Sequence, residues 1–262
     1  MLRKYVLKNG SLEVHFQNFG GVVTEILDKG INLLVGSEKD YAGAIIGRFA
    51  NRISGSSYTI NGNRYELFAN DGMNTLHGGK VGLDKVVWDV TQIEQNKKYR
   101  LTHLSPDGTE GHPGNLSINV TYSLTDENEF VIEYEATTDK VTHINLTHHC
   151  YFNLSGNPGS TILDHELEIA ADKYTEADPI TYIPTGNILP VEGKTDFRKA
   201  KLIGKDIDVA KDGFNHNYVL RGEKIAAKLI HKKSGRTVEV RTTEPGLMLY
   251  TGFYLSLPYA GV

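Results

Sequence analysis

The sequence predicts an all-β protein made of antiparallel strands, and three observations lead to this prediction. Apolar and polar residues alternate with a period of two in several segments, which is typical of strands with one buried face. Turn-forming sequences separate these segments. In the 262 residues we find no helix-length stretch with apolar residues at positions i, i+3, i+4 and i+7. We therefore expect a large antiparallel β-sandwich, folded as a single domain over residues 1–262.

The expected strands comprise one N-terminal strand, residues 12–16, and three hairpins. Each hairpin has a turn sequence between two strand segments: Asn61-Gly62 between 58–60 and 64–67, Asp126-Glu127-Asn128 between 116–124 and 130–136, and Ser234-Gly235 between 225–230 and 237–240. Residues 177–197 contain three of the eight prolines and are expected to form an irregular surface connection. No repeat of fixed period is present, which argues against a propeller or solenoid.

The composition excludes several classes of partner. The 28 basic and 32 acidic residues give a net charge of −4, which offers no broad positive field to nucleic acid. Cys150 is the only cysteine, so an internal disulfide is excluded and a reducing cytoplasm is the expected location. The N-terminus has no apolar run of signal-peptide length, and no later stretch approaches a membrane span. The sequence gives no indication of the oligomeric state.

Two polar segments contain the candidate proton-transfer groups. Residues 145–154 read Asn-Leu-Thr-His-His-Cys-Tyr-Phe-Asn-Leu, and residues 70–79 end in Leu-His-Gly-Gly. His148 and His149 are adjacent, so in a strand they point to opposite faces and only one of them can face a given pocket. His77 precedes two glycines, which allow the backbone to turn sharply near a ligand. Both His77 and His149 can exchange protons near neutral pH if their pKa is unperturbed.

Other polar residues have structural or binding interpretations. Asn51 and Arg52 offer hydrogen-bond donors that suit hydroxyl groups, although a strand-end ion pair would explain them equally. The remaining histidines that we weighed are interpreted as structural or surface residues: His15, His103, His112, His165 and His231. A zinc site from His148, His149 and Cys150 would need a severe backbone bend, with His143 as the only nearby supplement. We therefore expect no metal, and no Gly-x-Ser-x-Gly nucleophile motif is present.

Ordered motifs along nearly the whole chain resemble those of the aldose 1-epimerase family. The matching segments are Gly-Arg-Phe-Ala-Asn-Arg-Ile at 47–53, Leu-His-Gly-Gly at 76–79, Ser-Pro-Asp-Gly-Thr-Glu-Gly at 105–111 with Pro113-Gly114, residues 145–154, Leu-Asp-His-Glu-Leu at 163–167, Ile-Pro-Thr-Gly at 183–186 and the segment 245–252. The resemblance implies a galactose mutarotase-like β-sandwich without metal or organic cofactor. It also implies interconversion of the α and β anomers of a hexose such as galactose or glucose.

The resemblance assigns roles to individual residues. In the family a carboxylate removes the proton of the anomeric hydroxyl while a histidine protonates the ring oxygen, and the ring opens and recloses. By motif position His149 corresponds to that acid, and His77 to a histidine that binds or polarises the same region of the sugar. Asn51 and Arg52 fall on sugar-binding positions, and Tyr151 lies within a substrate-contacting stretch.

The chain departs from the family pattern at several positions. Asn215 stands where the family usually has an aspartate, Met248 where it has a glutamine, and His148 where it has an asparagine. The family's catalytic glutamate belongs to a C-terminal Glu-Thr-Gln motif. Here the chain ends at Val262, and residues 253–262 contain no carboxylate. We expect this base to be absent and the sandwich to be incomplete. A non-catalytic carbohydrate-binding relative, a truncated inactive epimerase and an enzyme in which Glu244 substitutes for the base are the alternatives.

Overall fold

The computed structural model describes residues 1–36, 38–207, 213–255 and 257–262. Its internal contacts divide the chain into two compact units. Unit 1 comprises Met1–Asn32 and Ser37–Cys150, and unit 2 comprises Leu33–Gly36 and Tyr151–Val262. Among the described residues, no helix combines the length and the apolar character that crossing a membrane requires.

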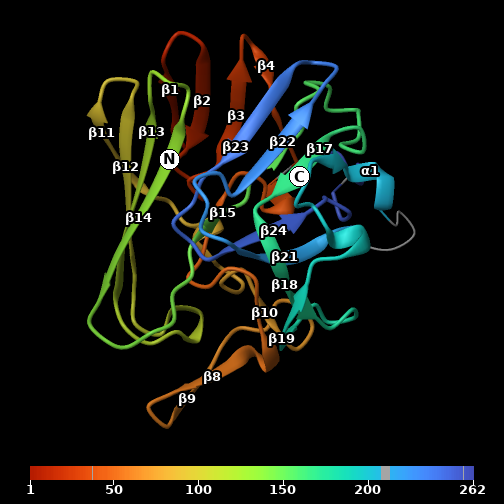
Figure 1. Ribbon diagram of the computed structural model, residues 1–262. Helices are drawn as coiled ribbons and strands as arrows, with labels where there is room; N and C mark the ends of the chain where they lie inside the picture. The colour runs from red at the N-terminus through yellow and green to blue at the C-terminus, as the bar shows by residue number, and fades with distance from the viewer. Residues whose placement is uncertain (37, 208–212, 256) are drawn as a thin grey trace. The chain divides into compact units, whose positions relative to one another are not determined.

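Unit 1 contains two four-stranded antiparallel sheets (Figure 1). The first sheet consists, in spatial order, of β1 (Lys4–Lys8), β2 (Leu12–Gln17), β3 (Val23–Asp28) and β4 (Ile31–Asn32). The second consists of β11 (Asp89–Glu94), β12 (Lys98–Ser105), β13 (Leu116–Leu124) and β14 (Phe130–Thr138). Each strand pairs with its neighbour in sequence, which is the arrangement that short hairpin turns produce.

The two sheets of unit 1 pack against each other through aromatic rings. Phe16 of β2 stacks on Tyr5 of β1 with centroids 5.1 Å apart. It also makes edge-to-face contacts with Tyr99 of β12 at 5.3 Å and Tyr122 of β13 at 5.2 Å. Such geometries stabilise aromatic pairs beyond the area that they bury. This face-to-face packing of antiparallel sheets is that of a β-sandwich and confirms the predicted fold class.

Shorter elements of unit 1 carry the polar motifs. They are the paired strands β6 (Ile45–Ile46) with β15 (Thr147–His148), β7 (Arg52–Ile53) with β10 (Thr75–Leu76) and β8 (Ser57–Ile60) with β9 (Asn63–Glu66), and the 3-10 turns η1 (Glu38–Asp40), η2 (Ser54–Ser56), η3 (Leu83–Lys85) and η4 (Thr109–Gly111). All three pairings are antiparallel. The β7–β10 and β6–β15 pairs bring segments about 25 and about 100 positions apart in the sequence into register, whereas β8 and β9 form a local hairpin.

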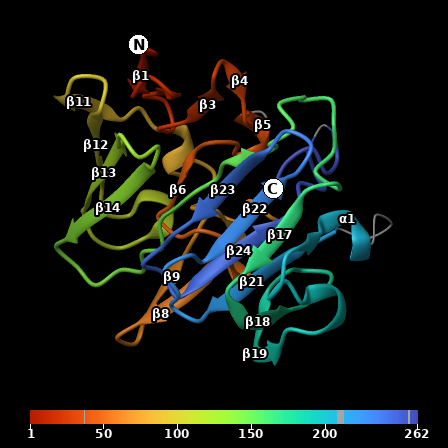
Figure 2. The same ribbon diagram turned by 45° about the horizontal axis from the view of Figure 1, so that its top comes forward.

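Unit 2 also contains two four-stranded antiparallel sheets, and Figure 2 shows β17, β22 and β23 side by side. One sheet has the spatial order β20 (Lys201–Leu202), β17 (Glu166–Ile169), β22 (Ala227–His231) and β23 (Arg236–Val240). The other has β19 (Pro184–Pro190), β18 (Ala171–Ala177), β21 (Asn215–Leu220) and β24 (Gly246–Tyr250). The remaining elements are the paired strands β5 (Leu34–Val35) and β16 (Tyr151–Phe152), the 3-10 turn η5 (Gly193–Thr195) and the helix α1 (Ile203–Asp206).

The three predicted hairpins are confirmed, at β8–β9, β13–β14 and β22–β23. The prediction of an irregular connection over residues 177–197 is wrong, because part of it forms β19. Pro184 and Pro190 lie at the two ends of this strand, which is at the edge of its sheet. An edge strand pairs on one side only, so prolines that lack an N–H are tolerated there.

Candidate functional site

His77 is positioned by the β7–β10 pair of unit 1. It directly follows β10, and Asn51 directly precedes β7, so the two residues lie opposite each other. The backbone N–H of His77 donates to the carbonyl oxygen of Asn51 at 3.1 Å. The backbone N–H of Asn51 donates in turn to Nδ1 of the His77 ring at 3.0 Å. The ring is therefore held by the same short ladder that holds its backbone.

These hydrogen bonds determine the tautomer of His77. Because Nδ1 accepts a hydrogen bond from the Asn51 N–H, the proton of the neutral ring lies on Nε2. Burial, together with the charges of His149, Arg52 and Lys85, lowers the pKa of His77 to about 3. At neutral pH His77 is therefore an uncharged ring that offers one N–H donor from Nε2.

Three residues support the loop that follows His77. Gly78 and Gly79 both have positive φ, 93° and 100°, and a Cβ on Gly78 would overlap the carbonyl oxygen of Gly47. The Asn70 side chain accepts the N–H of Leu76 at 2.7 Å and donates to the Gly79 carbonyl oxygen at 3.1 Å. The sharp turn predicted for the two glycines is confirmed, and it has a side-chain support that the sequence did not reveal.

Glu110 of η4 supports the same loop from the other side. Its carboxylate accepts the backbone N–H groups of Lys80 at 2.7 Å and Val81 at 3.1 Å. The buried guanidinium of Arg48 fixes the segment that carries Glu110. Arg48 donates to Ser105 Oγ at 3.0 Å and to three carbonyl oxygens, those of Ser105, Pro106 and Pro113. Two of the sequence motifs thus meet at Arg48, which has a structural role.

His149 follows β15 and is anchored to the segment before β6. Its N–H donates to the Ala44 carbonyl oxygen at 3.0 Å, and its carbonyl oxygen accepts the Gly43 N–H at 2.8 Å. The rings of His149 and His77 lie 5.3 Å apart, centroid to centroid, at an interplanar angle of 90°. Burial lowers the pKa of His149, while a hydrogen bond at its own backbone and the charge of Asp40 act in the opposite direction.

Arg52 completes the group of predicted residues in unit 1. Its Nε donates to Asp71 Oδ2 at 2.7 Å, and the Arg52 side chain is only 15% exposed. The positive charge of Arg52 contributes to the lowered pKa of His77. The structure therefore brings His77, His149 and Arg52 into one group.

Two further members of this group were not found from the sequence. The Tyr41 ring lies 4.9 Å from His77 and 6.2 Å from His149, centroid to centroid. Lys85 Nζ lies 5.2 Å from the centroid of Tyr41 and 2.7 Å from Asp84. Neither residue belongs to a polar motif or an alternating strand, so only their tertiary position reveals them.

His148 points away from this group, as alternation along the strand requires. Its ring contacts the Tyr122 hydroxyl at 3.1 Å through Nε2 and Cys150 Sγ at 3.3 Å through Nδ1. The Tyr122 hydroxyl donates to the Gly21 carbonyl oxygen, so it accepts from His148. Burial lowers the pKa of His148 to about 3 and raises that of Cys150 to about 12. The neutral thiol and ring form a hydrogen-bonded chain, and His149 does not converge with them on a metal ion.

The other predicted substrate-binding residues lie in unit 2. Tyr151 is buried on β16 and packs edge-to-face on Tyr250 at 6.0 Å. Asn215 pairs with Tyr250 across β21 and β24. Met248, two positions before Tyr250 on β24, is 44% exposed. Glu244 is exposed, which agrees with its interpretation as a solvent-facing residue.

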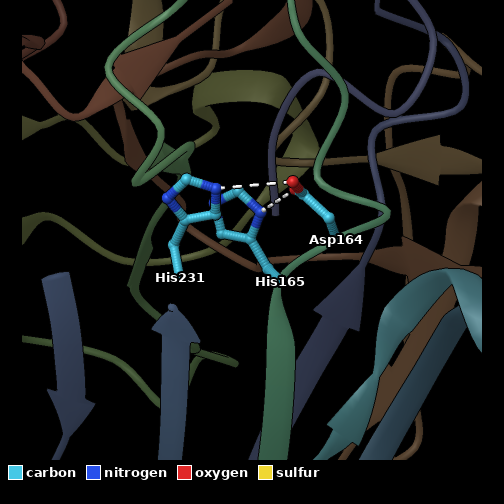
Figure 3. A group of neighbouring side chains, drawn as sticks. All are labelled: Asp164, His165 and His231. Carbon is cyan, nitrogen blue, oxygen red and sulfur yellow. Dashed lines mark ion pairs between the residues drawn. The ribbon is translucent and has the colours of Figure 1, made fainter. Parts of the chain in front are cut away.

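A second polar group in unit 2, the Asp164 cluster, consists of Asp164, His165 and His231 (Figure 3). His165 Nδ1 lies 3.3 Å from Asp164 Oδ1 and has no partner with hydrogen-bond geometry, and His231 Nε2 lies 3.5 Å from Asp164 Oδ2. On the opposite side, His165 Nε2 accepts the backbone N–H of Leu154 at 2.9 Å, and His231 Nδ1 lies 2.8 Å from the Ser234 hydroxyl, which donates to the Leu154 carbonyl oxygen.

These hydrogen bonds decide what the Asp164 cluster can hold. A neutral imidazole has one N–H, and the nitrogen that accepts a hydrogen bond does not carry it. The proton of neutral His165 therefore lies on Nδ1, which faces Asp164, where a metal ion would need a lone pair. The cluster is a structural connection between the segment before β17 and the β22–β23 turn, as we expected for both histidines.

Comparison with known protein sequences identifies the family of this chain. Residues 3–261 match the family model described as aldose 1-epimerase. The chain belongs to the aldose 1-epimerase family. It is 39% identical to human galactose mutarotase over 272 aligned residues, which cover 97% of this chain and 78% of the human protein. It is 40% identical to aldose 1-epimerase of Escherichia coli over 226 residues, which cover 82% of this chain and 64% of the bacterial protein.

Solved structures agree with this family assignment. The aldose epimerase homologue from C. elegans has a TM-score of 0.89 at 28% identity and covers 97% of this chain and 83% of its own. Galactose 1-epimerase from Lactobacillus acidophilus has a TM-score of 0.87 at 30% identity and covers 100% of this chain and 87% of its own. As an aldose 1-epimerase family member, the chain has the β-sandwich fold of these neighbours.

Proposed function

We propose that the protein interconverts the α and β anomers of a hexose, and that the arrangement of His77 and His149 carries this function. The orthogonal rings place two N–H donors within one small region of unit 1. Relatives named galactose mutarotase and aldose 1-epimerase support the substrate class. A cytoplasmic location suits a hexose substrate and the single free cysteine.

The two histidines take different parts in ring opening. Protonated His149 donates its proton to the sugar ring oxygen as the bond to the anomeric carbon breaks, and a solvent water takes the proton of the anomeric hydroxyl, so that the aldehyde forms. Ring closure on the other face reverses both proton transfers and restores protonated His149. His77 is fixed as the Nε2–H tautomer by the Asn51 N–H, so it polarises the same oxygen as a neutral donor. Arg52, held by Asp71, donates to the sugar hydroxyls. Asn51 shares in sugar binding in unit 1. For unit 2, sugar contacts are proposed from the sequence motifs alone, for Tyr151, Asn215 and Met248.

Polarimetry with freshly dissolved α-galactose and α-glucose tests this function. The protein should bring the optical rotation to equilibrium faster than buffer alone, with larger kcat/KM for the preferred hexose. Replacing His149 with alanine should lower kcat by about 10²–10⁴-fold, the usual contribution of a general acid. His15→Ala is the matched control, because His15 pairs with Glu13 and Glu25 outside this group.

A non-catalytic sugar-binding protein is the competing function. It predicts saturable binding of the hexose by calorimetry, while equilibration of the anomers is no faster than in buffer. That result would refute the enzymatic function.

A further inference from the structure

Tyr41 contacts both candidate catalytic histidines and a charged side chain as well. Its ring lies edge-on to His77, with an interplanar angle of 69°, and nearly parallel to His149, with an angle of 27°. The Lys85 ammonium lies over the same ring. A single aromatic ring therefore adjoins every imidazole of the group and one of its cations.

The backbone at Tyr41 is held in an unusual conformation. Its φ is +60°, in the left-handed region that non-glycine residues seldom adopt. His77, at +52°, and Asn51, at +64°, share this feature. Strained residues persist where the surroundings determine them, and they concentrate at functional sites. Here the Tyr41 side chain packs against a buried cluster, consisting of Val22, Ala44, Ile46 and Ala50.

This packing connects Tyr41 to the anchor of His149. Ala44, a member of the buried cluster, is the residue whose carbonyl oxygen accepts the His149 N–H. The Ala44 N–H donates to the Tyr41 carbonyl oxygen at 3.1 Å. The backbones of Tyr41 and His149 thus share Ala44, and a displacement of the tyrosine would displace the histidine.

We propose that Tyr41 is a positioning residue whose ring keeps His77 and His149 perpendicular and in contact. The Tyr41 ring contacts both imidazoles, so its removal would leave a gap beside each of them. Their mutual geometry would loosen, and misplacement of catalytic groups by about 1 Å costs up to about 100-fold in rate. This role rests on the function proposed for the two histidines.

Charged residues around His77 and His149 change the pKa of these two imidazoles. Lys85 and Arg52 disfavour a protonated His77, while Asp40 favours a protonated His149. Asp71 and Asp84 pair with the two cations. The ring of Tyr41 and its neighbours also exclude water from both imidazoles, and burial is the main cause of their lowered pKa. Removal of the ring should therefore raise the pKa of His149 and His77 toward 6.5.

Two substitutions separate the ring from the rest of the residue. Tyr41→Leu removes the ring, and Tyr41→Phe keeps it and removes only the hydroxyl. Both have a Cβ, so both retain the same backbone strain at this position. Tyr65→Leu on β9 is the matched control, because Tyr65 contacts Tyr58 and lies outside the group.

The first measurement is an NMR titration of the imidazole resonances in the full chain. Tyr41→Leu should raise the pKa of His149, whereas Tyr41→Phe and Tyr65→Leu should leave it as in the parent protein. In the kinetic measurement, kcat of Tyr41→Leu should fall at least about 10-fold with KM changed less than about 2-fold. Tyr41→Phe should restore more than half of the parent kcat.

Several outcomes would overturn the role of Tyr41. Unchanged imidazole titration and unchanged kcat in Tyr41→Leu would do so, as would an equal loss in Tyr41→Phe. If Tyr41→Leu does not fold, nuclear Overhauser contacts between the Tyr41 ring and both imidazoles in the parent protein decide, and their absence refutes the role. If the parent protein does not accelerate anomer exchange, the proposed function fails, and the NMR titration still tests Tyr41.

Discussion

Glutamine in place of Glu110 removes the charge that holds the backbone after His77. The carboxylate accepts two N–H groups, from Lys80 at 2.7 Å and Val81 at 3.1 Å. A glutamine amide has one oxygen, so one of these N–H groups would face an NH2 donor instead. Hydrogen bonds to a charged group contribute about 1.5–3 kcal/mol each, and partial solvent exposure favours the lower half of this range. A loss of about 1.5–2 kcal/mol in the free energy that keeps this loop closed corresponds to about a 10- to 30-fold change in its opening equilibrium.

Hydrogen exchange and kinetics together test this value. In Glu110→Gln the amides of Lys80 and Val81 should exchange about 10- to 30-fold faster than in the parent protein. The kcat/KM for anomer exchange should fall by up to the same factor, because the loop that carries His77 occupies its native position less often. Glu94→Gln, an exposed carboxylate on β11, is the matched control. Unchanged exchange at both amides would refute the idea that Glu110 holds this loop.

The remaining predictions concern buried polar groups. Tyr122→Phe leaves the His148 N–H unpaired and should destabilise the protein by about 1–3 kcal/mol, measured as a lower urea midpoint at unchanged slope; an unchanged midpoint would contradict the bond. Zinc added to the metal-free protein should not bind at the Asp164 cluster, and calorimetric binding that His231→Ala abolishes would contradict the tautomer assigned to His165. Stability should also fall as the pH falls below 6.5, because four histidines whose pKa is lowered to about 3 or 4 in the folded protein are protonated first in the unfolded chain. The loss should reach up to about 1.4 kcal/mol per histidine and pH unit down to about pH 4, and a constant urea midpoint between these values would contradict it. These four are His77, His112, His148 and His165.

Local sequence signals predicted the elements that depend on local chemistry. The Asn61-Gly62 and Ser234-Gly235 turns lie where the hairpins turn, because such turns need residues that tolerate positive φ. Alternation identified β13, whose residues Leu116 to Leu124 are buried at every second position. The same pattern in β14 leads only to partial burial, because β14 lies at the edge of its sheet. Edge position depends on the whole sheet, which a single segment does not encode.

The candidate site was predicted in part for a similar reason. His77, His149 and Arg52 stand in polar motifs, which are unusual in strands and therefore visible in the sequence. Tyr41 and Lys85 stand in or beside short 3-10 turns with no pattern of their own. Their contact requires residues 44 positions apart to meet, and only the tertiary structure specifies this.

The residues that support His77 are connected to one another through Arg48. Arg48 stands three positions before Asn51, whose N–H binds the His77 ring. The Arg48 side chain holds the segment from Ser105 to Pro113, and Glu110 in that segment holds the backbone beyond His77. Both flanks of the histidine are thus tied to the same buried guanidinium. Because the position is determined from two sides, the positive φ of His77 persists, and its ring is held in one orientation.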